Sequence, residues 1–186
     1  MLALTGSAQA ALQDRGGGMI YDTTRKITWL ADMNYANTSG HTGNGVFGNG
    51  TMTRSAAIAW ADGLVYGGFS DWRLPTLNLS DASCTGGIGP GSGFNCTGGE
   101  LSGLFVTDLG NKARESVLYQ VGDTPEQIAN LALFSNVQNN SYWSSTNYTG
   151  GFPGAEWSFA ATSGVQGISV IIMGNAVAVR PGDVAA

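Results

Sequence analysis

Glycine divides the C-terminal third of this chain into short segments. The segments SYWSSTNY, AEWSFAAT, VQGISVIIM and NAVAVRP are rich in aromatic and β-branched residues, and turn-forming pairs such as Gly150-Gly151 and Gly174-Asn175 separate them. Such residues favour strands, whereas glycine and asparagine favour the tight turns between strands. The pattern predicts an antiparallel meander from Asn139 onward. With 29 glycines in 186 residues, much of the surface is expected to be neutral loop.

A second strand pattern lies near the N-terminus, in GGGMIYDTTRKITWLADMNYA. Apolar and polar residues alternate on both sides of a polar turn that runs from Asp22 to Arg25. This alternation predicts a β-hairpin with one buried face. The side chains expected on that face are Met19, Tyr21, Ile27 and Trp29.

Three capping patterns predict short helices between the two strand regions. The predicted ranges are 54–64, with Thr53 as its N-cap, then 100–109, which ends before a glycine, and 125–134. The third carries the clearest signal, because Thr124 precedes Pro125 and Gln127 stands where a capping box requires it. Hairpin, short helices and meander together predict an α+β domain whose two ends meet in one sheet.

The chain has two cysteines, Cys84 and Cys96, inside the glycine-rich segment CTGGIGPGSGFNC. In an oxidising compartment they would close a short loop and stabilise it by about 3 kcal/mol. Two thiols and a single histidine, His41, are too few for a closed zinc site without carboxylates. A disulfide is therefore the expected structure here.

The scaffold is expected to rest on tryptophans and two arginines. The tryptophans expected to be structural are Trp29, Trp72, Trp143 and Trp157. Arg73 and Arg180 lie in apolar surroundings, DWRLP and VAVRPG, where a guanidinium must be paired or must donate to several carbonyls. We expect each arginine to hold a strand end to a neighbouring loop, with Asp71, Asp183 or backbone oxygens as partners.

The charge balance excludes several classes of partner. Lys and Arg number 8 and Asp and Glu 13, which gives a net charge of −5, and only 11% of residues are charged. Without a basic excess, the chain is not expected to bind nucleic acid or anionic membranes. Outside the N-terminal start, no apolar run approaches the ~20 residues needed to span a bilayer, so membrane insertion is not expected.

The start of the chain, MLALTGSAQAAL, has the pattern of the end of an export signal. A short apolar run precedes Ala8-Gln9-Ala10, which fits the small-residue pattern cleaved by signal peptidase. We interpret residues 1–10 as a signal-peptide remnant. The mature domain is then expected outside the cell or at its surface.

Catalytic signals are weak. His41 lies in a glycine-asparagine loop, and no nucleophile-elbow pattern accompanies it. No enzymatic activity and no cofactor are therefore expected. Calcium binding is neither predicted nor excluded. Asp32 with Asn34, or Asp71 with Asp81, offer the oxygen ligands that calcium prefers, but they lack EF-hand spacing.

The tract NNSYWSSTNYTGGFPGAEW has the composition of an adaptable recognition surface. It combines asparagine and serine with aromatic rings and glycine, as recognition loops do. In an alternative interpretation, Tyr142, Trp143 and Trp157 belong to the core and the other residues only form turns. The residues expected to bind a ligand are Asn139, Asn140, Asn147, Tyr148 and Phe152.

Five strings together resemble the Lcl C-terminal-type domain family, a domain of unknown function with a C-type-lectin-like fold. They are GGGMIYDTTRKITWLADMNYA, AIAWADGLVYGGFSDWRLPT, ALFSNVQNNSYWSST, AEWSF and AVAVRPGDV, and they span residues 16–184. DWRLPT and AVRPG are the most specific. The chain is also similar to exported bacterial surface proteins of the PEP-CTERM type, in which a sorting tail follows such a domain.

The resemblance implies a small twisted antiparallel sheet with two or three short helices and long irregular loops. RLPT also resembles formylglycine-generating enzymes, but Leu77, Asn78 and Leu79 stand where that enzyme has acidic residues, so its activity is not carried over. A further similarity is to lectin-like targets of diversity-generating retroelements.

The function expected from residues and resemblance is an exported, non-enzymatic binding domain. It would recognise a glycan or a surface protein through its C-terminal loops, in adhesion or in a biofilm matrix. Two alternatives are a self-associating surface protein, which would form homo-oligomers, and a hypervariable receptor-binding protein diversified by a retroelement.

Overall fold

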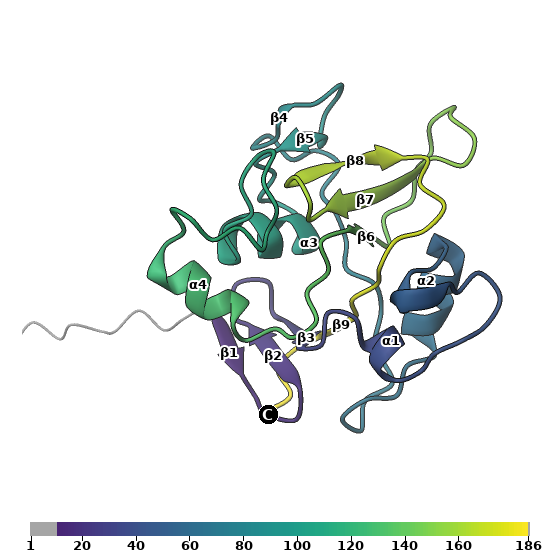
Figure 1. Ribbon diagram of the computed structural model, residues 1–186, viewed down its shortest axis with the longest axis vertical. Coiled ribbons are helices and arrows are strands. Elements are labelled where there is room, and N and C mark those ends of the chain that lie inside the picture. Colours follow the sequence, from purple (N-terminus) through teal and green to yellow (C-terminus); the bar gives the residue numbers. More distant parts are fainter. Residues whose placement is uncertain (1–10, 186) are drawn as a thin grey trace, which may run out of the picture.

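The computed structural model describes residues 11–185, an α+β structure with two antiparallel sheets and a few short helices (Figure 1). The predicted signal-peptide remnant, residues 1–10, lies outside the described residues. The first sheet has the order β1-β2-β3-β9 and consists of Leu12–Asp14, Met19–Asp22, Ile27–Leu30 and Val179–Pro181. The second sheet has the order β4-β5-β8-β7-β6 and consists of Thr85–Gly86, Gly93–Phe94, Val165–Ser169, Glu156–Ala160 and Ser141–Trp143.

The helices are short and lie beside the sheets. Figure 1 shows the first sheet at the lower end of the molecule and the second at the upper end, with α4 on one side and α1 and α2 on the other. The helical segments are α1 (Tyr35–Thr38), the 3-10 turn Gly48–Gly50, α2 (Arg54–Asp62), α3 (Glu100–Ser102), the π-helical turn Gly103–Asp108 and α4 (Pro125–Leu131).

The two ends of the chain meet in the first sheet, as the sequence predicted. β9 pairs antiparallel with β3, so that Trp29 lies opposite Val179 and Thr28 opposite Arg180. The predicted four-strand meander is therefore wrong in its last member. Only β6, β7 and β8 follow one another, because the chain leaves the second sheet after Ser169 and crosses to the first.

The N-terminal hairpin forms, but its buried face differs from the predicted one. In β2 the buried residues are Ile20 and Asp22, and Met19 and Tyr21 are half-exposed. All four residues of β3 are buried, because β3 has a strand on each side and both faces are covered. The predicted buried face of β2 was wrong because the charged residue Asp22, which the alternation places on the solvent side, is completely buried.

The helix predictions are confirmed in position and differ in length. α2 begins after its N-cap Thr53 and ends before Gly63, earlier than predicted. The second helix changes from α3 to the π-helical turn and ends before Gly110, whose φ of +75° suits glycine. At α4 the capping box of Thr124 and Gln127 is present as predicted.

Segment 71–76, DWRLPT, forms only a single bridge to β9. The backbone N–H of Arg73 donates to the carbonyl of Val179, and the reverse bond is also made, each at 2.8 Å. Proline at position 75 has no N–H, so the segment cannot extend this ladder as a regular strand.

Two hydrophobic clusters form the core, and the four expected tryptophans are buried in them. The larger cluster contains Trp29 and Trp157 with the side chains of the π-helical turn, and the smaller contains Trp72 and Trp143 with those of α2. Each buried indole N–H needs an acceptor. Trp143 donates to the carbonyl of Met52 at 2.7 Å and thereby ties β6 to the start of α2.

Arginine–carboxylate pairs join segments that are distant in sequence. Arg180 pairs with Asp71, as expected, and its guanidinium lies 4.0 Å from the ring centre of Phe69. Arg73 pairs with Glu100, rather than with an aspartate, through two bonds of 2.7 Å, and it also donates to the backbone carbonyl of Leu74 at 3.1 Å, one of the backbone oxygens expected as partners. Asp183 pairs with Arg15.

The turn of the N-terminal hairpin carries the most deeply buried ion pairs. Arg25 donates through one nitrogen to Asp22 at 2.5 Å and to Asp108, in the π-helical turn, at 2.6 Å. Asp22 also accepts from the backbone N–H groups of Thr24 and Arg25 and from the indole of Trp29. Arg25 therefore neutralises two buried carboxylates and fastens the first sheet to the π-helical turn.

Replacing Arg25 by methionine should destabilise the fold strongly. Asp22 and Asp108 would stay buried without their shared cation, and breaking such a pair costs about 3–5 kcal/mol. The control is Lys26→Met, which removes the same charge from the exposed neighbour and should cost less than about 0.5 kcal/mol. Urea unfolding measures both variants, and equal free energies of unfolding would contradict the role of Arg25.

Candidate binding surface

The five residues expected to bind a ligand lie in two groups at opposite ends of β6. Asn139 and Asn140 come directly before the strand, and Asn147, Tyr148 and Phe152 follow it in the connection to β7. The structure therefore does not bring all five together.

The first group is occupied by hydrogen bonds within the protein. Asn139 accepts from the hydroxyl of Ser116 at 2.7 Å. Asn140 donates at 2.8 Å to the buried side chain of Asn175, which in turn donates to Asn34. Asn140 is thus part of an amide network that joins β6 to the segment before β9.

In the second group, Asn147 is held by an arginine that the sequence interpretation did not select. Arg54, at the start of α2, donates to the side chain of Asn147 and to the carbonyls of Ser144, Ser145 and Thr146 at 2.9–3.1 Å. Four acceptors on one short stretch fix the first half of the β6–β7 connection. The sequence offered no signal for this, because Arg54 lies 90 or more positions away.

Tyr148 and Phe152 differ in their exposure. Tyr148 packs partly buried against the larger hydrophobic cluster, whereas the side chain of Phe152 is 66% exposed. Of the five expected residues, Phe152 offers the most open apolar surface in the described structure.

Phe152 belongs to an exposed apolar face, which we define as Ile88, Phe152, Ala155, Ile168 and Val170. These residues, with Ser169, line a hollow of about 370 Å³. Ile88 is 92% and Val170 70% exposed, which is unusual for branched aliphatic side chains. Ile88 lies in the β4–β5 loop, Phe152 and Ala155 in the β6–β7 connection, Ile168 in β8 and Val170 directly after it. These segments lie near one another at the upper end of the molecule (Figure 1).

A second, smaller hollow of about 210 Å³ lies beside the first. Ile88 and Ile168 line both hollows, and the second is completed by the glycine-rich hairpin and the first residues of β8. Neither hollow is lined by a charged residue. The sequence predicted Phe152 as a surface residue but did not indicate Ile168 and Val170, because VQGISVIIM has the pattern of an ordinary strand. Ile88 was not predicted because the segment CTGGIGPGSGFNC was considered only for its disulfide.

The disulfide of Cys84 and Cys96 closes the hairpin that carries Ile88, as the sequence predicted. A Cβ at Gly87 would overlap the carbonyl of Ser92, so the close approach of the two arms requires glycine there. β5 pairs with β8 at only two positions, Val165 and Gln166. The disulfide therefore supplies much of the constraint on this loop.

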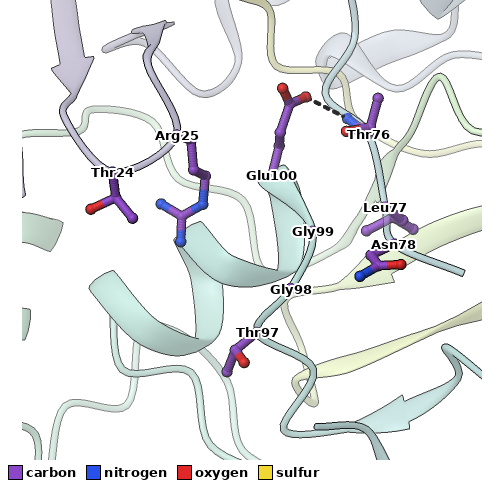
Figure 2. A pocket seen from close by; sticks show the side chains of 9 residues that line it. All are labelled: Thr24, Arg25, Thr76, Leu77, Asn78, Thr97, Gly98, Gly99 and Glu100. Atoms are coloured by element: carbon purple, nitrogen blue, oxygen red, sulfur yellow. Dashed lines mark hydrogen bonds between the residues drawn. The ribbon is translucent and has the colours of Figure 1, made fainter. Parts of the chain in front are cut away.

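A polar hollow of about 280 Å³ lies between the hairpin turn and the start of α3 (Figure 2). It is lined by Thr24, Arg25, Thr76, Leu77, Asn78, Thr97, Gly98, Gly99 and Glu100. Arg25 is engaged by Asp22 and Asp108, and Glu100 by Arg73. Its charged groups thus hold the fold together, and the hydroxyls and amides offer only neutral hydrogen bonding.

Glu100 in this hollow and Asp108, the partner of Arg25, have pKa values shifted in opposite directions. Burial works to raise the pKa of Glu100, but hydrogen bonds from Arg73 and from the backbone N–H of Thr76, shown in Figure 2, lower it below its usual value. For Asp108, burial outweighs the charge of Arg25 and raises the pKa.

The carboxylates considered for calcium are engaged separately. Asp71 pairs with Arg180, and Asp81 accepts from Ser83 and from the backbone N–H of Gly98. Asp32 accepts from the backbone N–H of Asn34. Asp71 and Asp81 therefore each accept hydrogen bonds from a different segment of the chain.

Among residues 11–185, no helix has both the length and the apolar composition needed to cross a bilayer. Comparison of the chain with protein-family models, with curated proteins and with solved structures found no match in any of the three.

Reducing the disulfide should loosen the hairpin that carries Ile88. The bond closes a 12-residue separation, for which the loop-entropy relation gives about 3 kcal/mol. We expect Cys84→Ala/Cys96→Ala to lower the free energy of unfolding by about 2–3 kcal/mol and to speed amide exchange most strongly in residues 85–95. Uniform acceleration across the chain would contradict a local effect.

Acid should destabilise the protein partly through Glu100. Because its folded pKa is lowered, the Glu100 pair contributes stability above the unfolded pKa of about 4.3, and this stability is lost as pH falls through the folded pKa. Glu100→Gln should cost roughly 1 kcal/mol at neutral pH, since Arg73 is half-exposed, and should flatten the loss below about pH 4.5.

The matched control for this titration is Glu126→Gln, which removes the same charge from an exposed side chain of α4. Urea unfolding between about pH 2 and pH 7 compares the two variants with the wild type. If Glu100→Gln and wild type lose stability in parallel with acid, Glu100 does not contribute as argued.

Proposed function

We propose that this chain is an exported, non-enzymatic binding domain that holds an apolar segment of a partner protein on its apolar face. The observation that carries the proposal is the exposure of Ile88, Phe152 and Val170 around an uncharged hollow. Contiguous exposed apolar groups on a folded domain mark interaction sites, because exposing them to water costs free energy that a partner recovers.

The loops that carry this face are held at defined points, which supports a binding role. The disulfide closes the β4–β5 hairpin, and Arg54 fixes the start of the β6–β7 connection. Loops held by a rigid scaffold present a surface that loses little conformational entropy when a partner binds.

A C-type-lectin-like architecture and membership of the Lcl C-terminal-type family remain part of the proposal. Two features support it: the chain ends meet in one sheet, and a second sheet bears irregular loops. Export is supported by the disulfide, since disulfides form and persist in oxidising compartments.

Phe152 favours a second candidate ligand, a neutral glycan stacked on its exposed ring. Apart from Ser169, the hollow beside it is lined by apolar side chains, which offer few partners for sugar hydroxyls. The observations therefore favour a protein segment over a sugar. Diversification by a retroelement gains no support, because Asn140 and Asn147 serve internal hydrogen bonds.

The proposal is tested on arrays of extended ten-residue peptides with graded apolar content, and in parallel on a neutral-glycan array with and without calcium. We expect apolar peptides to bind and both Phe152→Ser and Val170→Ser to weaken binding at least about tenfold, as loss of one or more buried apolar side chains implies. Val65→Ser is the matched control, because Val65 is equally exposed and outside the face.

Unchanged binding in both face variants would overturn the assignment of the face, as would the absence of any peptide or glycan signal. A signal confined to glycans and lost in Phe152→Ser would replace the protein segment by a sugar as the ligand.

A further inference from the structure

We propose that a second copy of this chain covers the apolar face when no other partner does, so that two copies form a two-fold dimer through this face. The inference rests on the proposed function only in treating the same surface as a binding surface. Three observations favour a second copy as the occupant.

The first observation is that the face carries both an exposed apolar side chain and an apolar hollow. The Ile88 side chain is almost completely exposed at the rim shared by both hollows. The larger hollow, of about 370 Å³, is lined by Phe152, Ala155, Ile168 and Val170 as well. Under a two-fold axis, each Ile88 enters the hollow of the other copy, so one apolar contact is made twice.

The second observation concerns charge. Two copies with a net charge of −5 repel each other, and the repulsion is least where carboxylates are absent. From Trp157 to Val179 the sequence contains no charged residue, and neither hollow has a charged lining residue. Glu156, next in sequence, pairs with Arg54. This face therefore permits close approach of two acidic molecules.

The third observation is the partly free edge of β8. β5 pairs with Val165 and Gln166, whereas Gly167, Ile168 and Ser169 have a strand partner only on the β7 side in the described structure. Natural edge strands are usually protected by charge, proline or a bulge. The free positions Gly167, Ile168 and Ser169 include no charged residue and no proline, so this edge favours pairing with the same edge of another copy.

The face consists of five residues, far fewer than the roughly 20–30 that each partner contributes to a standard interface, and the dimer is accordingly weak. Interfaces smaller than the standard size bind transiently, so we expect a dissociation constant on the order of 10 to 1000 μM. A partner that occupies the same face should compete with the second copy.

The experiment is sedimentation velocity on the oxidised chain, from about 1 μM to about 1 mM, which spans the expected dissociation constant. The wild type should shift from monomer to dimer over this range. Ile88→Asp should remain monomeric throughout, because it places a carboxylate in an apolar hollow. Val65→Asp adds the same charge to an exposed valine outside the face and should dimerise like the wild type.

The fold of both variants is checked by thermal unfolding, which should be unchanged because each side chain is exposed in the monomer. A strict monomer at every wild-type concentration would overturn the inference, and so would dimerisation of Ile88→Asp. If the wild type stays monomeric while Ile88→Asp loses peptide binding, only the dimer fails. If the dimer forms as expected and no array ligand binds, only the proposed function fails.

Discussion

The buried pairing of Arg25 with Asp22 and Asp108 is the interaction on which the rest of the structure depends. Two carboxylates out of contact with water need a cation and several donors, and Arg25, two backbone N–H groups and an indole supply them. The pairing joins a turn of the first sheet to the π-helical turn 83 positions later. That turn supplies Leu104 and Phe105 to the larger cluster, so the ion pair sets the position of the core.

The two sheets form the two ends of the molecule. We call the first sheet the fixed end, because strands from both ends of the chain pair in it, and the second sheet the presenting end, because its loops carry the apolar face. At the fixed end, the two chain ends pair in one sheet, and arginine–carboxylate pairs close the turns around it. At the presenting end, the second sheet ends in loops whose apolar side chains face outward. The loops gain their definition from a disulfide and from Arg54 rather than from long strands. A low-charge sequence suits this division, because its few charges are used in internal pairs.

Local patterns were enough to predict much of the secondary structure. The capping box at α4, the hairpin around Asp22 and the strands β6, β7 and β8 each follow from residues close together in sequence. The errors arose where a distant contact overruled a local pattern. Asp22 breaks the expected alternation because Trp29 and Arg25 satisfy its carboxylate, and β9 leaves the meander because β3 offers it a partner. For the binding surface, Phe152 was predicted, whereas Asn140 and Asn147 bond to residues that sequence spacing could not bring near them.

The sequence by itself determined the α+β class and the disulfide of Cys84 with Cys96, because capping, alternation and cysteine spacing act over short distances. Only the tertiary structure decided which apolar residues stay exposed. Ile88, Phe152 and Val170 have the same chemistry as core residues, and their exposure follows from where the two sheets and their loops come to lie. Burial depends on the positions of distant segments, so no local pattern could have distinguished the apolar face from the core.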